Sequence, residues 1–182
     1  MNKAWVAVVA LLAGLASGSA GAVDGVSLQW GSGSGATSDS GIDMMQVALQ
    51  WDWNQRWFQA NDWHVGGFWD VDASYWRRDA LQGQNDHLSE IGLTPVFRLQ
   101  QNDLQGVYLE AGVGVHLLSK TSLGDKRYST AFQFGSHLGG GYRFGARHAF
   151  DLGYSFQHIS NANIKLPNDG ANFQEVRLQY HF

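Results

Sequence analysis

Residues 62–76 read DWHVGGFWDVDASYW, and two kinds of side chain alternate along this stretch. The odd positions carry Trp63, Val65, Gly67, Trp69, Val71, Ala73 and Tyr75, whereas the even positions include His64, Asp70, Asp72 and Ser74. Alternation with a period of two predicts a β-strand with one apolar and one polar face. The stretch is also longer than the roughly 9–11 residues that a tilted strand needs to cross a bilayer.

The same alternation recurs along the chain. It is found in residues 26–30, 43–53, 62–76, 87–101, 106–119, 132–144, 150–156 and 176–182. The apolar row has odd numbers from residue 43 to residue 119 and changes to even numbers after residue 128. These stretches predict an all-β fold, an eight-stranded antiparallel transmembrane β-barrel. Eight strands enclose a space that side chains fill, so we expect a polar interior in which Asp70, Glu90, Glu110 and Glu175 pair with Arg98, Arg143 and Arg177. A soluble sandwich or lipocalin is the alternative, but the tryptophans and tyrosines would then need partners in its core.

The N-terminal residues have the three parts of a secretory signal peptide. Lys3 is followed by an apolar run over residues 4–16 and by small residues that end in Ala20-Gly21-Ala22. We therefore expect residues 1–22 to be a signal peptide and residues 23–182 to form one domain, the outer-membrane barrel. No later stretch is apolar enough for a spanning helix.

The composition and the residue spacing indicate which cofactors and partners the chain is not expected to have. The 182 residues contain no cysteine, which agrees with a fold that is stable in an oxidising compartment through its hydrogen bonds. The net charge of -4 at pH 7 offers no broad basic surface and argues against a nucleic-acid partner. Histidines and carboxylates show no spacing typical of a zinc or calcium site, so we expect no metal.

Three polar residues break the lipid-facing rows near one rim of the predicted barrel. An even number of strands places both termini in the periplasm and the longer loops outside the cell, at residues 34–41, 77–86, 119–128 and 161–171. The seventh strand then runs outward, and His158 and Ser160 continue its lipid-facing row, while Asn172 emerges on the same face of the last strand. Polar groups that face lipid are costly unless they are satisfied, and they indicate a functional site.

The three residues suit nucleophilic catalysis on an ester. His158 would take the proton of Ser160, and Asn172 would fix the tautomer of the imidazole. Backbone N–H groups after Ser160, or the side chain of Asn161, would donate to the oxyanion. At the outer leaflet of a Gram-negative outer membrane the substrate would be lipopolysaccharide. On spacing alone, the alternative remains that His158 and Ser160 lie at head-group level without a catalytic role.

Several segments resemble the outer-membrane lipid A 3-O-deacylases. They include Trp51-Asp52-Trp53, Pro95-Val96-Phe97, Glu110 to Val115 and, most specifically, His158-Ile159-Ser160-Asn161-Ala162 with Pro167-Asn168-Asp169-Gly170. The resemblance extends over nearly all of the chain after residue 22. It implies an eight-stranded barrel that hydrolyses the ester at the 3-position of lipid A with a serine and a histidine on its outside wall. A 3-hydroxy fatty acid would be released, without a cofactor.

The resemblance also assigns roles to single residues. It implies Ser160 as nucleophile and His158 as base, with an oxyanion region formed by Asn161, Ala162, Asn163 and Asn168. The chain departs from the family pattern at two positions, because Asn172 stands where a glutamate is expected and Asn163 where a glycine is expected. Asn172 can accept the imidazole N–H, but it stabilises an imidazolium less than a carboxylate does, which predicts reduced or more pH-dependent activity.

Several alternatives stay open on the sequence. Asp169, in the outer loop, could orient His158 in place of Asn172, whereas Glu175 has an odd number and should face the lumen. The basic outer-loop residues that would either meet lipid A phosphates or be solvated are Arg77, Arg78, Lys120, Lys126 and Arg127.

Two other functions also remain. One is a non-catalytic structural or adhesion barrel in which Asn172 marks lost activity, and the other is a different lipid-modifying enzyme, a phospholipase or an acyltransferase. The expected partners are lipid A of lipopolysaccharide and the outer membrane. The sequence leaves the oligomeric state open, a homodimer included.

Overall fold

The described part of the chain is built mainly of antiparallel strands. The computed structural model describes residues 22–33, 39 and 41–182, so residues 1–21 of the predicted signal peptide (1–22) and most of the first outer loop (34–41) lie outside the described residues. The strands are β1 (Gly25–Gly33), β2 (Ile42–Asp52), β3 (Trp57–Ala60), β4 (Trp63–Arg78), β5 (His87–Gln101), β6 (Gly106–Leu118), β7 (Ser122–Leu123), β8 (Lys126–Arg127), β9 (Phe132–Phe144), β10 (Phe150–Ser160) and β11 (Ala171–His181). One 3-10 turn, η2 (Ala146–His148), precedes β10.

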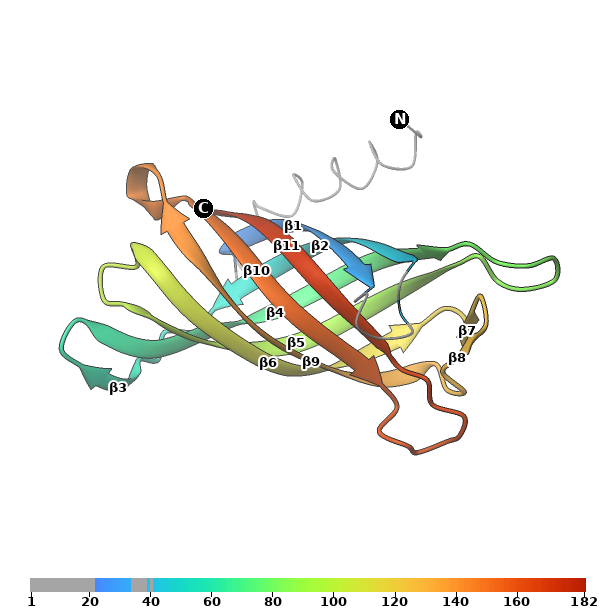
Figure 1. Ribbon diagram of the computed structural model, residues 1–182. Helices are drawn as coiled ribbons and strands as arrows, with labels where there is room; N and C mark the ends of the chain where they lie inside the picture. Colours follow the sequence, from blue (N-terminus) through green and yellow to red (C-terminus); the bar gives the residue numbers. More distant parts are fainter. Residues whose placement is uncertain (1–21, 34–38, 40) are drawn as a thin grey trace.

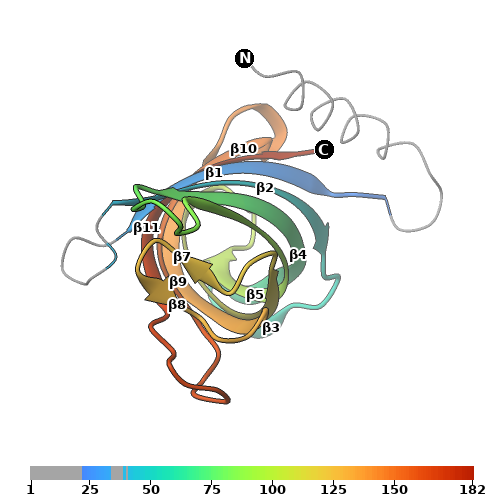
Figure 2. The same ribbon diagram turned by 90° about the vertical axis from the view of Figure 1, so that its right-hand side faces the viewer.

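Eight of the strands in the described part of the chain close into a barrel. The order is β2-β1-β11-β10-β9-β6-β5-β4, and an additional pairing between β2 and β4 closes the ring. The long strands run at a steep tilt in Figure 1, and the end view in Figure 2 shows the ring that they enclose. β3 folds back on the start of β4, and β7 and β8 form a separate hairpin at the other end of the barrel. The predicted all-β, eight-stranded antiparallel barrel is thus confirmed.

The alternation in the sequence corresponds to the two faces of the wall. On β6, Val107, Leu109 and Val113 are exposed, whereas Tyr108 and Glu110 are buried in the lumen. The predicted change of phase is also present, because on β9 the exposed residues carry even numbers. Within the residues described, no helix is long and apolar enough to cross a membrane.

Buried ion pairs fill the middle of the lumen. Glu110 accepts hydrogen bonds from both Arg98 and Arg177, each at 2.8 Å. Arg98 also donates to Asp151 at 3.1 Å, and its guanidinium lies 3.9 Å from the centre of the Tyr108 ring. The other predicted inner acids bind neutral or imidazole partners instead: Asp70 accepts from Gln50, Glu90 from Ser74 and His116, and Glu175 from Gln29 and Ser155.

The outer end of the lumen differs from this polar middle, because it holds an apolar cluster. Its members are Ile42, Met44, Trp76, Leu88, Leu118, Leu123, Tyr128, Ile159, Ala171 and Phe173. Leu123 and Tyr128 belong to the loop that carries β7 and β8, and this hairpin lies across the mouth of the ring in Figure 2. The loop excludes water from the end of the barrel, so apolar side chains pack there as in a small core.

The apolar cluster has a direct consequence for β10 and β11. Ile159 and Ala171 are buried in it, with relative exposures of 1% and 0%. Because neighbouring side chains on a strand point to opposite faces, the burial of these residues directs the side chains next to them to the outside wall. The residues so directed are His158, Ser160 and Asn172.

Candidate active site

His158 and Ser160 lie on the outside wall at the outer end of β10. The register pairs His158 with Asn172 on β11, and Ile159 with Ala171 forms the last pair of the two strands. Opposite residues in an antiparallel pair have Cβ atoms about 4.5–5.5 Å apart, so His158 and Asn172 are direct neighbours. The exposed apolar residues Phe150, Leu152, Tyr154 and Phe156 continue the same row toward the other end of β10.

The three side chains form one hydrogen-bonded chain. Ser160 Oγ lies 3.0 Å from His158 Nε2, and Asn172 Oδ1 lies 2.8 Å from His158 Nδ1. A carbonyl oxygen can only accept, so the contact with Asn172 places the imidazole proton on Nδ1. Nε2 then has a free lone pair, which accepts the hydrogen bond from the Ser160 hydroxyl.

The turn after Ser160 is held to the barrel by Asn161. Its side-chain Nδ2 donates to the carbonyls of Tyr128 and Lys165 at 2.8 and 2.7 Å, and its backbone N–H donates to Asn168 Oδ1 at 3.1 Å. The side-chain amide of Asn161, one of the predicted oxyanion donors, is therefore already engaged in the loop.

Two positive φ angles bend the backbone of this turn. Ala162 and Asn163 have φ angles of 51° and 62°. Asn163 Oδ1 accepts from Asn168 Nδ2 at 3.1 Å, so Asn168 bridges the two ends of the loop. The two residues that depart from the family pattern both have partners in the site. Asn163 is hydrogen-bonded to Asn168, and Asn172 is hydrogen-bonded to His158.

The loop between β10 and β11 also docks on the β7–β8 hairpin. Asp169 accepts a hydrogen bond from the backbone N–H of Arg127 at 2.7 Å, and Ser129 Oγ donates to the Pro167 carbonyl at 2.6 Å. The carboxylate of Asp169 therefore holds the loop and does not contact His158. Glu175 lies in the lumen, as predicted, and so cannot reach His158 through the wall.

Gly170 is a site neighbour whose role the sequence did not indicate, although it belongs to the stretch that carries the resemblance. Its φ angle is +61°, and a Cβ at this position would lie 3.3 Å from His158 Cε1 and 3.4 Å from Ser160 Cβ. A side chain would therefore crowd the histidine. A glycine permits this approach without cost to the backbone.

Asp39 and Lys126 lie behind Asn172. No sequence motif indicated Asp39, and Lys126 was expected either to meet lipid A phosphates or to be solvated. Asn172 Nδ2 donates to Asp39 Oδ2 at 2.8 Å, and Asp39 forms an ion pair with Lys126. Lys126 is only 4% exposed, so it is neither a solvated charge nor a free contact for phosphate. The pKa of Tyr128 is raised, because burial disfavours the phenolate and the nearby Asp39 carboxylate repels it.

One group of potential metal ligands lies inside the barrel. Asp72, Glu90 and His116 are buried, and one ligand atom of each lies within 4.8 Å of the others. His116 Nδ1 is already hydrogen-bonded to Glu90 Oε1 at 2.6 Å. This group is on the lumen side of the wall and is separate from the site on the outside.

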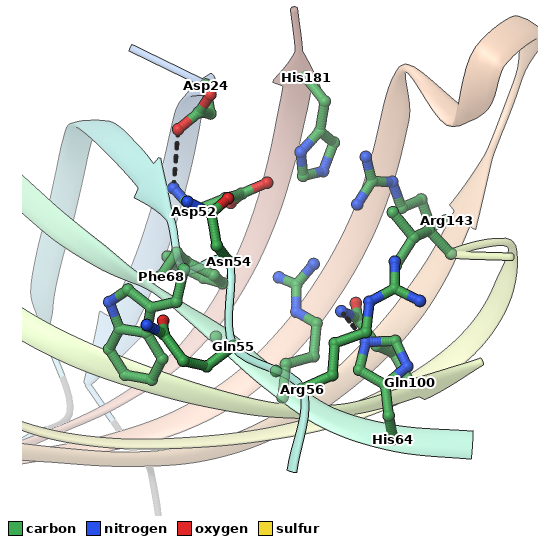
Figure 3. Close-up of a pocket in the computed structure, with 15 residues that line it drawn as sticks. Asp24, Asp52, Asn54, Gln55, Arg56, His64, Phe68, Gln100, Arg143 and His181 are labelled. Carbon is green, nitrogen blue, oxygen red and sulfur yellow. Dashed lines mark hydrogen bonds between the residues drawn. The ribbon is translucent and has the colours of Figure 1, made fainter. Parts of the chain in front are cut away.

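A cavity of about 330 Å³ opens at the barrel end opposite to His158. Figure 3 shows polar side chains around it, among them Arg56, His64, Arg143 and His181, with Asp24 bound to the backbone of Asp52. It is the unfilled end of the lumen on the predicted periplasmic side. Aromatic residues surround this end, where Trp53 packs edge-to-face against Trp57, Trp69 and Phe97. The cavity is therefore not part of the outer site.

Comparison with known proteins relates this geometry to one family. The family model described as lipid A 3-O-deacylase (PagL) matches residues 43–181. The chain is 33% identical to the lipid A deacylase PagL of Pseudomonas aeruginosa, over 75% of this chain and 76% of that protein. It is 32% identical to the lipid A deacylase PagL of Bordetella bronchiseptica, over 100% of this chain and 97% of that protein.

Solved structures give the same relationship. The crystal structure of the outer-membrane enzyme PagL superposes with a TM-score of 0.73 at 26% identity and covers 87% of this chain and 99% of its own. The Neisserial surface protein A superposes with a TM-score of 0.51 at 15% identity, over 87% of this chain and 94% of its own, and shows the barrel fold alone. The predicted outer-membrane location agrees with these matches. The chain therefore belongs to the PagL family of lipid A 3-O-deacylases, whose fold is an outer-membrane β-barrel.

Proposed function

We propose that this protein is a serine esterase that hydrolyses the ester-linked acyl chain at the 3-position of lipid A and releases a 3-hydroxy fatty acid. The observation that carries the proposal is the hydrogen-bonded chain from Ser160 through His158 to Asn172 on the outside wall. Its two relatives from Pseudomonas aeruginosa and Bordetella bronchiseptica are lipid A deacylases by name, which supports lipid A as the substrate.

The geometry supports a two-step mechanism. His158 Nε2 takes the proton of Ser160 while Oγ attacks the ester carbonyl, and the imidazolium returns this proton to the oxygen of the leaving lipid A hydroxyl. The acyl chain is then bound to Ser160 as an ester. A water molecule, deprotonated by His158, attacks this ester and releases the fatty acid, which restores the Ser160 hydroxyl.

The oxyanion of each step needs hydrogen-bond donors close to Ser160. We assign this role to the backbone N–H groups of the turn at Ala162 and Asn163, because the side-chain amide of Asn161 donates to two loop carbonyls. Asn168 keeps the turn in place through its contacts with Asn161 and Asn163.

The surroundings of the site favour a substrate with acyl chains. Tyr154 and Phe156 are exposed on the wall next to His158, and Ile164 and Leu166 of the loop are 66% and 71% exposed. A substrate whose acyl chains lie in the bilayer would bring its ester bonds to this rim. The acyl chains of the bilayer would also cover the exposed aromatic and aliphatic side chains of this wall.

Mass spectrometry of lipid A tests the proposal. We expect cells that express the wild type to lose one hydroxyacyl chain from lipid A, and cells that express Ser160→Ala to retain it. Ser89→Ala is the matched control, because Ser89 is an exposed serine on β5 and lies far from His158 in the register. Ser89→Ala should deacylate like the wild type. Asn172→Ala should lower the extent of deacylation by removing the acceptor for His158 Nδ1.

The same measurement separates the alternatives. Unchanged lipid A with the folded wild type in the membrane would refute the deacylase and favour a non-catalytic barrel, the alternative suggested by an asparagine at position 172. An acyl chain that moves to a new acceptor would indicate an acyltransferase, and loss of acyl chains from phospholipids would indicate a phospholipase. Full activity of Ser160→Ala would refute Ser160 as the nucleophile.

A further inference from the structure

Behind the proposed catalytic residues lies a buried carboxylate that no sequence motif indicated. Asp39 is 1% exposed, and its Oδ2 accepts a hydrogen bond from Asn172 Nδ2 at 2.8 Å. Asn172 in turn contacts His158 Nδ1 through its Oδ1 at 2.8 Å. The hydrogen-bonded chain therefore extends one residue beyond Asn172, to an acid.

The carboxylate determines which way the amide of Asn172 points. An ionised carboxylate can only accept hydrogen bonds, so the NH2 group of Asn172 must face Asp39. The carbonyl oxygen is then directed at His158, where it accepts from Nδ1. A flipped amide would oppose its oxygen to the Asp39 carboxylate and lose that hydrogen bond. Its NH2 group would donate to Nδ1, which moves the imidazole proton to Nε2, where it blocks acceptance of the Ser160 proton.

Lys126 holds Asp39 in place. It forms an ion pair with Asp39, and its ammonium group also donates to the carbonyl of Gly170 at 3.0 Å. Lys126 belongs to β8, and Gly170 lies at the end of the loop that follows Ser160. The ion pair is therefore connected both to the β7–β8 hairpin and to the loop next to Ser160. A buried charge of this kind is tolerated because it is paired and hydrogen-bonded.

We propose that Asp39 is a positioning residue that acts on His158 through Asn172, so that the Asn172–Asp39 pair takes the place of a single acidic residue. This inference rests on the proposed serine esterase function. The charge of Asp39 polarises the amide of Asn172 and makes Oδ1 a stronger acceptor, since hydrogen bonds in a chain strengthen one another. The amide then holds the productive tautomer of His158 and stabilises the imidazolium that forms when Ser160 loses its proton.

Exchanging the two side chains tests this arrangement. Asp39→Asn should lower kcat by about tenfold to a hundredfold with KM changed less than about twofold, because the substituted amide no longer fixes Asn172. The double variant Asp39→Asn with Asn172→Asp places the carboxylate directly against His158. Its asparagine at position 39 donates to that carboxylate and can still accept from Lys126, so most of kcat should return.

The exchange separates positioning from a purely structural role. If Asp39 served only to pair with Lys126, the double variant would remain as impaired as Asp39→Asn, since both lack the ion pair. Asp125→Asn is the control, because Asp125 lies next to Lys126 on the β7–β8 hairpin and forms a 2.9 Å ion pair with Arg78 of β4. Loss of this ion pair should leave kcat unchanged. All variants are compared as full-length, folded barrels in detergent micelles, with the kcat and KM for release of fatty acid from lipid A.

Three outcomes overturn the inference. If Ser160→Ala is inactive but Asp39→Asn keeps the wild-type kcat, Asp39 has no positioning role and the proposed esterase stands. A folded double variant that does not recover kcat overturns the inference in the same way. If the wild type releases no fatty acid, or Ser160→Ala still releases it, the proposed function fails and the inference fails with it.

Discussion

Replacement of Gly170 by alanine should reduce both stability and activity, for two separable reasons. The first is the backbone, because Gly170 has a φ angle of +61°. A left-handed conformation costs an L-residue about 1–2 kcal/mol. We therefore expect Gly170→Ala to lower the free energy of unfolding by about 1–2 kcal/mol on these grounds.

The second reason is crowding of the proposed base. The new Cβ would lie 3.0 Å from the carbonyl oxygen of Ile159 and 3.3 Å from His158 Cε1. The Ile159 carbonyl belongs to the strand β10, so the imidazole is the group that gives way, by a few tenths of an ångström. A misplacement of about 1 Å costs about a hundredfold in rate, so a shift of this smaller size should lower kcat/KM by about tenfold.

Gly83→Ala is the matched control for the cost of placing an alanine at a positive φ angle. Gly83 has a φ angle of +88° in the loop between β4 and β5, and a Cβ there would meet no atom within 4 Å. Denaturant unfolding in micelles should show a loss of stability in both variants. kcat/KM for lipid A deacylation should fall only in Gly170→Ala. Equal activity of the two variants per folded molecule would refute the crowding argument.

Two further predictions concern the lumen and the loop. Glu110→Ala should destabilise the barrel by about 3–5 kcal/mol, because it leaves the buried guanidinium groups of Arg98 and Arg177 without their shared carboxylate. A free energy of unfolding within about 1 kcal/mol of the wild-type value would contradict this prediction. Asn168→Ala removes the acceptor for the backbone N–H of Asn161 and should lower kcat by about tenfold through a looser oxyanion turn. Steady-state kinetics that match the wild type would show that Asn168 does not shape this turn.

Features that depend on neighbouring residues could be predicted from the sequence. Which side chains of a strand face the lumen and which face the outside follows from the period of two, which is a local property of the sequence. The same period predicts that His158 and Ser160 share a face. The contact between His158 and Asn172 needed one more assumption, that β10 and β11 are adjacent and joined by the loop in between. The structure has this register, with the two residues directly opposite.

Features that depend on distant parts of the chain could not be predicted. Asp39 lies 133 positions before Asn172, and no periodicity connects them. The strands β7 and β8 have two residues each, too few to leave an alternating pattern. From the sequence, Lys126 was consequently expected either to meet lipid A phosphates or to be solvated, whereas the fold of the hairpin buries it against Asp39.

The position of His158 and Ser160 on the outside wall determines how the substrate arrives. A site inside a cleft samples its substrate from solution in three dimensions, whereas this one meets molecules that diffuse laterally within one leaflet. Under the proposed function, turnover should then follow the mole fraction of lipid A in the surface and not its bulk concentration. Neutral detergent added to mixed micelles should slow the enzyme by surface dilution, without any change in its fold.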